Sequence, residues 1–141
     1  MPSTAVSAVV LIGLVVVVTG IGLVWRARNG RLRTQEPDDT VALTASDLGV
    51  SLGERATLVQ FSTAFCQPCR TTRIVLDDVS SLVEGVAHVE IDAESHLELV
   101  RRLDIMRTPT VLVLDSAGRI VKRASGAPRK ADVLAVLGEI V

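Results

Sequence analysis

Residues 57–70 read TLVQFSTAFCQPCR, an apolar run that leads directly into two cysteines three positions apart. The run over 57–62 is rich in β-branched and apolar side chains, which predicts a strand buried on both faces. Apolar residues then recur at helical spacing over about 67–83, so Cys66 and Cys69 stand at the beginning of a helix. This stretch therefore predicts a buried strand, a short loop that ends in a cysteine, and a helix that carries the second cysteine.

The place of the two cysteines favours redox chemistry. A cysteine at a helix N-terminus meets unpaired backbone N–H groups and the positive end of the helix dipole, and both favour the thiolate form of Cys66. Cys69 lies one helical turn further on, close enough to attack a mixed disulfide formed at Cys66. Pro68 stands in the first turn, where the backbone N–H that proline lacks would have no partner within the helix.

A cysteine pair with this spacing has three other interpretations. A structural zinc site needs four ligands, and besides the cysteines only His88 and His96 are available as nitrogen ligands. Haem attachment needs a histidine after the second cysteine, where this chain has Arg70. A purely structural disulfide would close only a two-residue loop and would constrain little. We therefore expect a redox-active pair, with no metal and no cofactor.

Further along the chain, apolar patterning predicts alternating strands and helices. The expected strands cover 41–43, 57–62, 86–91, 110–114 and 119–122, and the expected helices begin near 44–47 and cover 67–83, 94–103 and 129–141. A turn at 115–118 joins the last two strands as a hairpin. Because strand–helix–strand units give parallel neighbours and a hairpin gives antiparallel ones, we expect an α/β fold with a mixed central sheet and helices on both faces.

The N-terminal segment differs in composition from the rest. Residues 5–25 carry no charge, and at about 1.5 Å per residue they are long enough to cross the hydrocarbon core of a bilayer. Trp25 ends this run. Four arginines follow: Arg26, Arg28, Arg31 and Arg33. We therefore predict one N-terminal transmembrane helix, an anchor with a basic collar over 1–28, then a linker over 29–40 and a folded domain over 41–141.

Two other interpretations of residues 5–25 stay open. A buried core helix is one, although the domain that follows has no use for so long an apolar helix. A cleaved signal peptide is the other, but it has positive charge before the apolar run and small residues after it, whereas WRAR follows here. The arginines after the helix favour a single-pass membrane protein with a cytoplasmic domain, and an extracytoplasmic domain is the alternative.

Composition excludes several classes of protein. The formal net charge is −1 and 48% of residues are apolar, whereas a disordered charged tail would be poor in apolar residues. No basic surplus exists to neutralise phosphates, so we expect no nucleic-acid partner. Two cysteines are too few for a disulfide-rich secreted scaffold.

Five segments carry a resemblance to a known family. They are LVQFSTAFCQPCR at 58–70, VEID at 89–92, RTPTVLVL at 107–114, DSAG at 115–118 and SG at 125–126. In this order they resemble the thioredoxin family, and the resemblance covers about 41–141. It implies a thioredoxin-like fold and a thiol–disulfide oxidoreductase, with Cys66 as the exposed nucleophile and Cys69 as the resolving cysteine.

The resemblance also implies a surface for substrate. Pro109 would follow a cis peptide bond and face the Cys66 sulfur, and the backbone of Thr108 would pair with a substrate strand. The expected substrate-binding residues are Phe65, Pro68, Thr108 and Pro109.

Three positions depart from the family pattern. Phe65 replaces a tryptophan before the first cysteine and keeps an apolar rim. Gln60 replaces a buried acid that handles the proton of the resolving cysteine, and His88 replaces a lysine. Gln60 cannot titrate, but histidine titrates near neutral pH, so His88 with Gln60 is a candidate for proton handling. The alternative is a histidine with no role in the chemistry.

We therefore expect a membrane-anchored thiol–disulfide oxidoreductase that reduces protein disulfides through Cys66 and Cys69. Its partners would be a protein disulfide substrate, an upstream thiol reductant and the lipid bilayer around residues 5–25. The alternative is a non-catalytic thioredoxin-fold docking module at the membrane, against which the presence of both cysteines argues.

Overall fold

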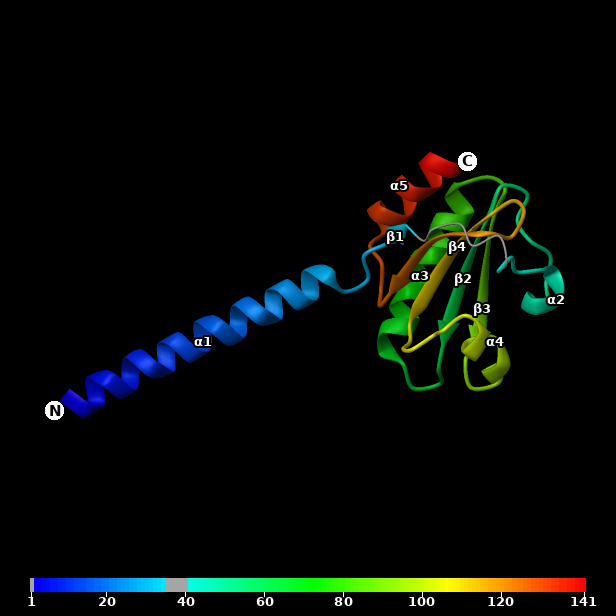
Figure 1. Ribbon diagram of the computed structural model, residues 1–141. Helices are drawn as coiled ribbons and strands as arrows, with labels where there is room; N and C mark the ends of the chain where they lie inside the picture. The colour runs from blue at the N-terminus through cyan, green and yellow to red at the C-terminus, as the bar shows by residue number, and fades with distance from the viewer. Residues whose placement is uncertain (1, 35–40) are drawn as a thin grey trace.

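The computed structural model describes residues 2–34 and 41–141. A long helix projects from a domain in which shorter helices flank a central sheet (Figure 1). The elements are α1 (Pro2–Arg28), β1 (Arg33–Thr34), α2 (Ala45–Leu48), β2 (Ala56–Ser62), α3 (Gln67–Leu82), β3 (Val86–Asp92), α4 (Leu97–Arg102), β4 (Thr110–Asp115), β5 (Ile120–Ser125) and α5 (Lys130–Ile140).

The sheet is mixed, as the sequence predicted. Its strand order is β1-β5-β4-β2-β3, with β2 parallel to β3 and every other neighbouring pair antiparallel. Val59 of β2 lies opposite both Val89 of β3 and Leu112 of β4. All seven residues of β2 are buried, because the strand has a neighbour on each side and helices over each face.

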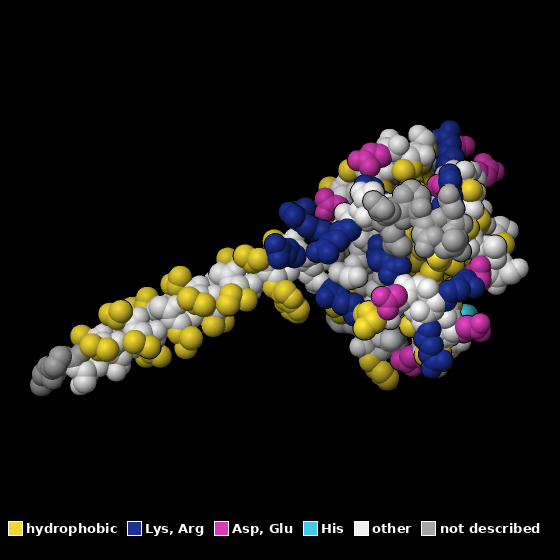
Figure 2. Space-filling model, viewed as in Figure 1, with side chains coloured by type: hydrophobic (Ala, Val, Ile, Leu, Met, Phe, Trp, Pro, Cys, Tyr) yellow, Lys and Arg dark blue, Asp and Glu magenta, His cyan; other side chains and the backbone are white. Residues whose placement is uncertain are grey.

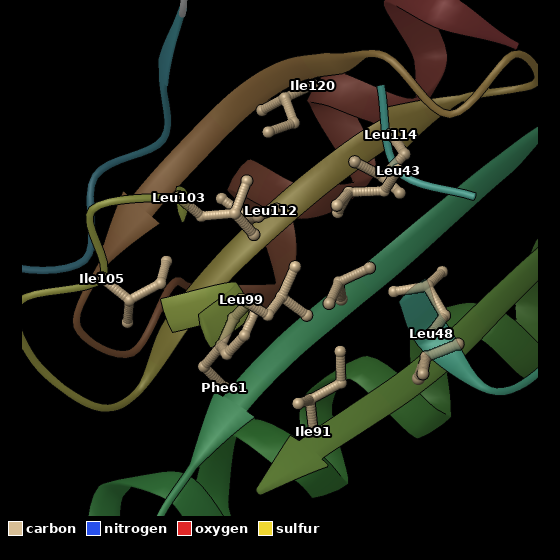
Figure 3. Packing of buried hydrophobic residues seen from close by; sticks show 12 residues of the cluster. Leu43, Leu48, Phe61, Ile91, Leu99, Leu103, Ile105, Leu112, Leu114 and Ile120 are labelled. Atoms are coloured by element: carbon tan, nitrogen blue, oxygen red, sulfur yellow. The ribbon is translucent and has the colours of Figure 1, made fainter. Parts of the chain in front are cut away.

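Side chains that alternate along the strands form two cores, one on each face of the sheet. On one face Phe61 and Leu112 pack with Leu99 of α4 (Figure 3). On the other face Leu58 packs with Leu76 of α3 and with residues of α5. Burial of each such side chain contributes about 1.5–3 kcal/mol, and the two cores confirm helices on both faces of the sheet.

Several elements differ from the sequence-based expectation. The strand expected at 41–43 is wrong: only Ala42 forms an isolated bridge, to Arg119, before the chain turns into the capping box of α2 at Thr44. Helix α4 begins at Leu97 rather than at 94, because the Asp92 carboxylate accepts hydrogen bonds from the residues that follow β3.

The buried face of α3 is formed by Cys69, Thr72, Leu76 and Val79. Of the apolar residues whose spacing indicated this helix, Val79 is buried, whereas Leu82 in the last turn is 61% exposed. The buried face therefore begins at the second cysteine, and this fixes Cys69 against the sheet.

Helix α1 has the length and composition of a membrane span. The most apolar 18-residue window of Ser3–Arg28 has a mean hydropathy of 2.7, and none of it is buried against the rest of the described chain. Apolar side chains cover the face of the helix that the space-filling view shows (Figure 2). An N-terminal signal sequence has the same length and composition, so these properties alone identify a candidate span.

The end of α1 is joined to the domain by hydrogen bonds. Gly30 has a positive φ of 76° and its N–H donates to the carbonyl of Ser125 at 3.0 Å. A side chain at Gly30 would place Cβ 2.0 Å from the Ala127 carbonyl oxygen, so the close approach requires glycine. Strand β1 then pairs with β5, inside the range 29–40 where we expected a linker; residues 35–40 of that range lie outside the described residues.

Candidate active site

The two cysteines lie where β2 ends and α3 begins. Cys66 is the N-cap residue of α3, with extended backbone, and its sulfur accepts a hydrogen bond from the Cys69 N–H at 3.2 Å. A disulfide joins Cys66 to Cys69 across a Cα–Cα distance of 5.2 Å. Cys66 is half-buried, whereas Cys69 is 1% exposed. The outer sulfur is therefore the one that a second protein can reach.

Exposed apolar residues occur near Cys66 in the chain and in the loop before Thr108. Phe65 is 101% exposed and Pro68 is also exposed, one on either side of the first cysteine along the chain. Met106, two residues before Thr108, is 83% exposed. All three side chains are thus open to solvent and available for contact with another molecule. Sequence analysis did not identify Met106, because a single methionine in a loop carries no pattern.

The loop that contains Thr108 and Pro109 is held beside the cysteine loop. The Thr108–Pro109 peptide bond is cis, which is the geometry that the family resemblance implied. The hydroxyl oxygens of Thr63 and Thr108 lie 3.3 Å apart and connect the two loops. The Gly126 N–H donates to the Pro109 carbonyl at 2.7 Å and ties the loop to the end of β5.

A buried polar network extends from Cys69 to the surface. The Gln60 side chain is fully buried, and its Nε2 donates to the Cys69 carbonyl at 2.8 Å and to the Ser62 hydroxyl at 3.0 Å. Its Oε1 lies 3.2 Å from His88 Nε2. His88 Nδ1 lies 2.5 Å from an oxygen of Asp77, a carboxylate whose side chain is 64% exposed. Asp77 is a further polar residue of this site that sequence analysis did not identify.

The partners in this network fix the orientation of the Gln60 amide. Its two N–H hydrogens point to the Cys69 carbonyl and the Ser62 hydroxyl, so its oxygen faces His88 Nε2. The His88 side chain is 5% exposed, and it is linked to Cys69 through Gln60 and directly to Asp77.

Two ionised groups near the site have shifted pKa values. Hydrogen bonding to Glu90 of β3 raises the pKa of Arg73, so the charge of this arginine is paired across α3 and β3. The Ser95 hydroxyl and the Glu94 N–H lower the pKa of Asp92 at the end of β3. Among residues 2–34 and 41–141, no group of three or more His, Cys, Asp or Glu side chains is arranged to hold a metal ion.

The structure brings most of the predicted site residues together. Gln60, His88 and Cys69 form one hydrogen-bonded network, and Thr108 reaches the cysteine loop through Thr63. Phe65 and Pro68 flank Cys66 in the chain and remain exposed, without a polar contact to this network.

A dithiol that closes to a disulfide at the start of a helix is the chemistry of a thiol–disulfide oxidoreductase. The chain belongs to the thioredoxin family, because the family model described as Thioredoxin matches residues 40–139. This confirms the family that the motifs around Cys66 and Pro109 suggested.

Individual relatives agree with this assignment. Over 73 residues the chain is 41% identical to human Thioredoxin domain-containing protein 2, a match that covers 50% of this chain and 13% of the human protein. Over 85 residues it is 32% identical to the Bifunctional thioredoxin reductase/thioredoxin of Mycobacterium leprae (strain TN), covering 60% of this chain and 18% of that protein. The matches thus span less than a fifth of these two relatives.

A thioredoxin of Mycobacterium tuberculosis (strain ATCC 25618 / H37Rv) matches over more of its length. It is 27% identical over 109 residues, covering 75% of this chain and 93% of that thioredoxin. Among solved structures, chloroplastic thioredoxin z superposes with a TM-score of 0.59 at 24% identity, covering 70% of this chain and 90% of that one. The structural likeness shows the fold.

Proposed function

We propose that this protein is a membrane-anchored oxidoreductase that reduces disulfides in other proteins. The observation that carries the proposal is the unequal exposure of the two cysteines: Cys66 is half-buried at the N-cap of α3, and Cys69 is buried beneath it. An exposed nucleophile and a sheltered resolving thiol are what a two-step exchange requires.

In the reduced protein, the Cys66 thiolate attacks one sulfur of a target disulfide. The target S–S bond breaks, one target sulfur leaves as a thiolate, and a mixed disulfide joins Cys66 to the target. The Cys69 thiolate then attacks the Cys66 sulfur and releases the second target thiolate. Two electrons have passed to the target, and Cys66 and Cys69 are left as the disulfide seen here. An upstream thiol reductant returns the pair to the dithiol.

The resolving step needs Cys69 to lose its proton in a buried place, where an isolated thiolate is costly. His88 lies behind Cys69, linked to it through Gln60 and hydrogen-bonded at the surface to Asp77. We assign His88 and Gln60 to the handling of the Cys69 proton in this step, with Asp77 orienting the His88 ring.

The target strand would dock at the loop of Thr108 and Pro109. Thr108 lies beside the cysteine loop, so main-chain hydrogen bonds to Thr108 would bring a target disulfide to Cys66 by strand addition. Phe65 and Pro68 would contribute the exposed apolar rim of this surface, and the exposed Met106 would extend it.

Helix α1 would anchor the protein as a single-pass membrane segment. The arginines that follow it favour a cytoplasmic domain, where thiols are kept reduced and a reductase has its electron supply. In this arrangement the anchor covers residues 1–28 and the thioredoxin-like domain covers 41–141.

Trapping of the mixed disulfide tests the proposal. In Cys69→Ser the resolving thiol is missing, so a covalent complex with a disulfide-containing target should accumulate at Cys66 on non-reducing gels. Cys66→Ser is the matched control and should trap almost none. Equal trapping by the two variants, or none by either, would support the docking-module alternative instead.

A further inference from the structure

The junction between α1 and the domain encloses a cavity that thiol–disulfide exchange does not use. Its volume is about 510 Å³, and nine residues from the end of α1, from residues 29–34, from β5 and from the position before Thr108 line it. Five of the nine are arginines: Arg28, Arg31, Arg33, Arg107 and Arg123. Among the described residues no aspartate or glutamate lines this arginine cavity.

The fold forces these like charges together. Arg33 of β1 lies directly opposite Arg123 of β5 in the antiparallel pair, a placement in which like charges destabilise each other. Arg107 is held at the same edge, because its Nη2 donates to the Ser125 carbonyl at 3.0 Å. Burial lowers the pKa of Arg123 and the nearby Asp104 raises it, and Arg123 Nη1 donates to the Asp104 carbonyl at 3.5 Å. Lysine and arginine side chains gather visibly where the apolar helix meets the domain (Figure 2).

The chemistry of the lining selects an anion with several oxygens. Guanidinium groups present paired N–H donors that match phosphate oxygens, and several arginines around one cavity can share such a group. Asn29, Thr34 and Ser125 add uncharged polar groups to the same wall.

The position of the cavity indicates where such a phosphate would come from. Trp25 lines the cavity, ends the apolar run of α1 and is 70% exposed. A tryptophan at the end of a membrane span lies at headgroup level, so the arginines beside it lie at the depth of the lipid phosphates. The ligand must therefore be an anion and must lie at the bilayer surface, and an anionic phospholipid satisfies both conditions.

We propose that the arginine cavity binds the phosphate of an anionic phospholipid headgroup and thereby holds the redox domain against the bilayer surface. This proposal rests on the proposed anchoring of α1 in a membrane. Arg107 directly precedes Thr108, so the headgroup would lie one residue from the loop proposed to dock the target. Bound lipid would thus fix the orientation of the active site relative to the membrane.

Fluorescence of Trp25, the single tryptophan of the chain, offers a direct readout. The full-length protein in an uncharged maltoside detergent would be titrated with dihexanoyl phosphatidylglycerol and, separately, with dihexanoyl phosphatidylcholine. We expect a saturable change with phosphatidylglycerol at least about tenfold tighter than with phosphatidylcholine, since only the first carries net negative charge. Inorganic phosphate and a glutamate-rich peptide should bind at least about tenfold more weakly than phosphatidylglycerol.

Substitutions of the cavity arginines test whether phosphatidylglycerol binds in the cavity. Arg31→Gln combined with Arg33→Gln should weaken phosphatidylglycerol binding about tenfold or more, because two exposed cavity arginines lose their charge. Arginine-to-lysine changes at the same two positions should retain most of the binding. Arg55→Gln is the control: it removes an exposed arginine that directly precedes β2 and does not line the cavity. The affinity of this variant for phosphatidylglycerol should stay within about twofold of that of the native protein.

Several results would overturn the proposal. Equal affinity for the two lipids, or no loss in the double variant, would show that the arginines do not select the headgroup. Phosphate or acidic peptide bound as tightly as phosphatidylglycerol would make the cavity a site for a free anion or an acidic partner. Carbonate extraction of membranes tests the anchor separately, and the disulfide-trapping experiment tests the redox function, so failure of either is distinguishable from failure of the lipid site.

Discussion

The active site and the arginine cavity meet at residues 107–109, yet they are built from different groups. At the active site the buried amide of Gln60 has partners on both its nitrogen and its oxygen, and Cys69 is 1% exposed. In the cavity Arg33 and Arg123 face each other, and no carboxylate of the described residues lines the wall. A satisfied network positions one sulfur, whereas a surplus of like charge leaves room for an anion.

Neighbouring parts of this fold are thus built for separate tasks. The redox pair needs rigid placement of two sulfur atoms, and the packed start of α3 supplies it. The proposed lipid site needs several positive charges close together, and the junction of α1 with β5 supplies them. If this division is correct, changes in one region should leave the other largely unaffected.

The largest expected effect is on the rate of disulfide reduction, which should depend on Cys66 and not on the arginine cavity. Cys66→Ser should lower the rate of insulin disulfide reduction by at least about a thousandfold, because no other group replaces the nucleophile. Arg33→Gln should leave that rate in detergent solution within about twofold, since Arg33 does not contact the cysteines. If Arg33→Gln lost as much activity as Cys66→Ser, the arginine cavity would be part of the catalytic machinery and the division into two regions would be wrong.

A second prediction concerns the helix that carries Cys69. Leu76→Ala removes a fully buried side chain of α3 and should lower the free energy of unfolding by about 2–5 kcal/mol. Leu82→Ala changes a residue of the same helix that is 61% exposed and should cost about 0.5 kcal/mol or less. Chemical denaturation of the two variants measures both values, and similar costs would mean that the buried face of α3 is assigned wrongly.

A smaller effect is expected from the contact between Asp77 and His88. Asp77→Asn removes the carboxylate that orients His88, so the link from His88 through Gln60 to Cys69 is less well held and the reduction rate should fall about tenfold. Asp78→Asn is the matched control, because the neighbouring carboxylate pairs with Lys130 instead. A changed pH profile in Asp77→Asn alone would support the network, and identical rates in both variants would remove His88 from the chemistry.

Much of the redox region could be predicted because its determinants are local. The apolar run at 57–62, the cysteine spacing and the helical pattern lie within one short stretch, so local sequence contains the strand, the helix start and the place of Cys66. The same reasoning fails for Ala42, where pairing ends after one bridge because the chain turns into α2.

The remaining features depend on contacts between distant segments. The contact of Asp77 with His88 joins α3 to β3, and each residue by itself has the pattern of an ordinary surface group. The arginine cavity is harder still, because Arg107 and Arg123 join the collar arginines only after the sheet has formed and β1 has paired with β5. The sequence shows the collar, but it does not show which distant arginines complete it.

The reduction potential of the Cys66–Cys69 couple tests the central claim most directly. It can be measured by equilibrating the full-length protein with defined dithiol–disulfide buffers and quantifying the oxidised fraction. A protein-disulfide reductase should have a potential near the thioredoxin value of about −270 mV. A potential near about −120 mV, where the disulfide is a strong oxidant, would contradict the claim, because electrons would then flow from the target to the protein.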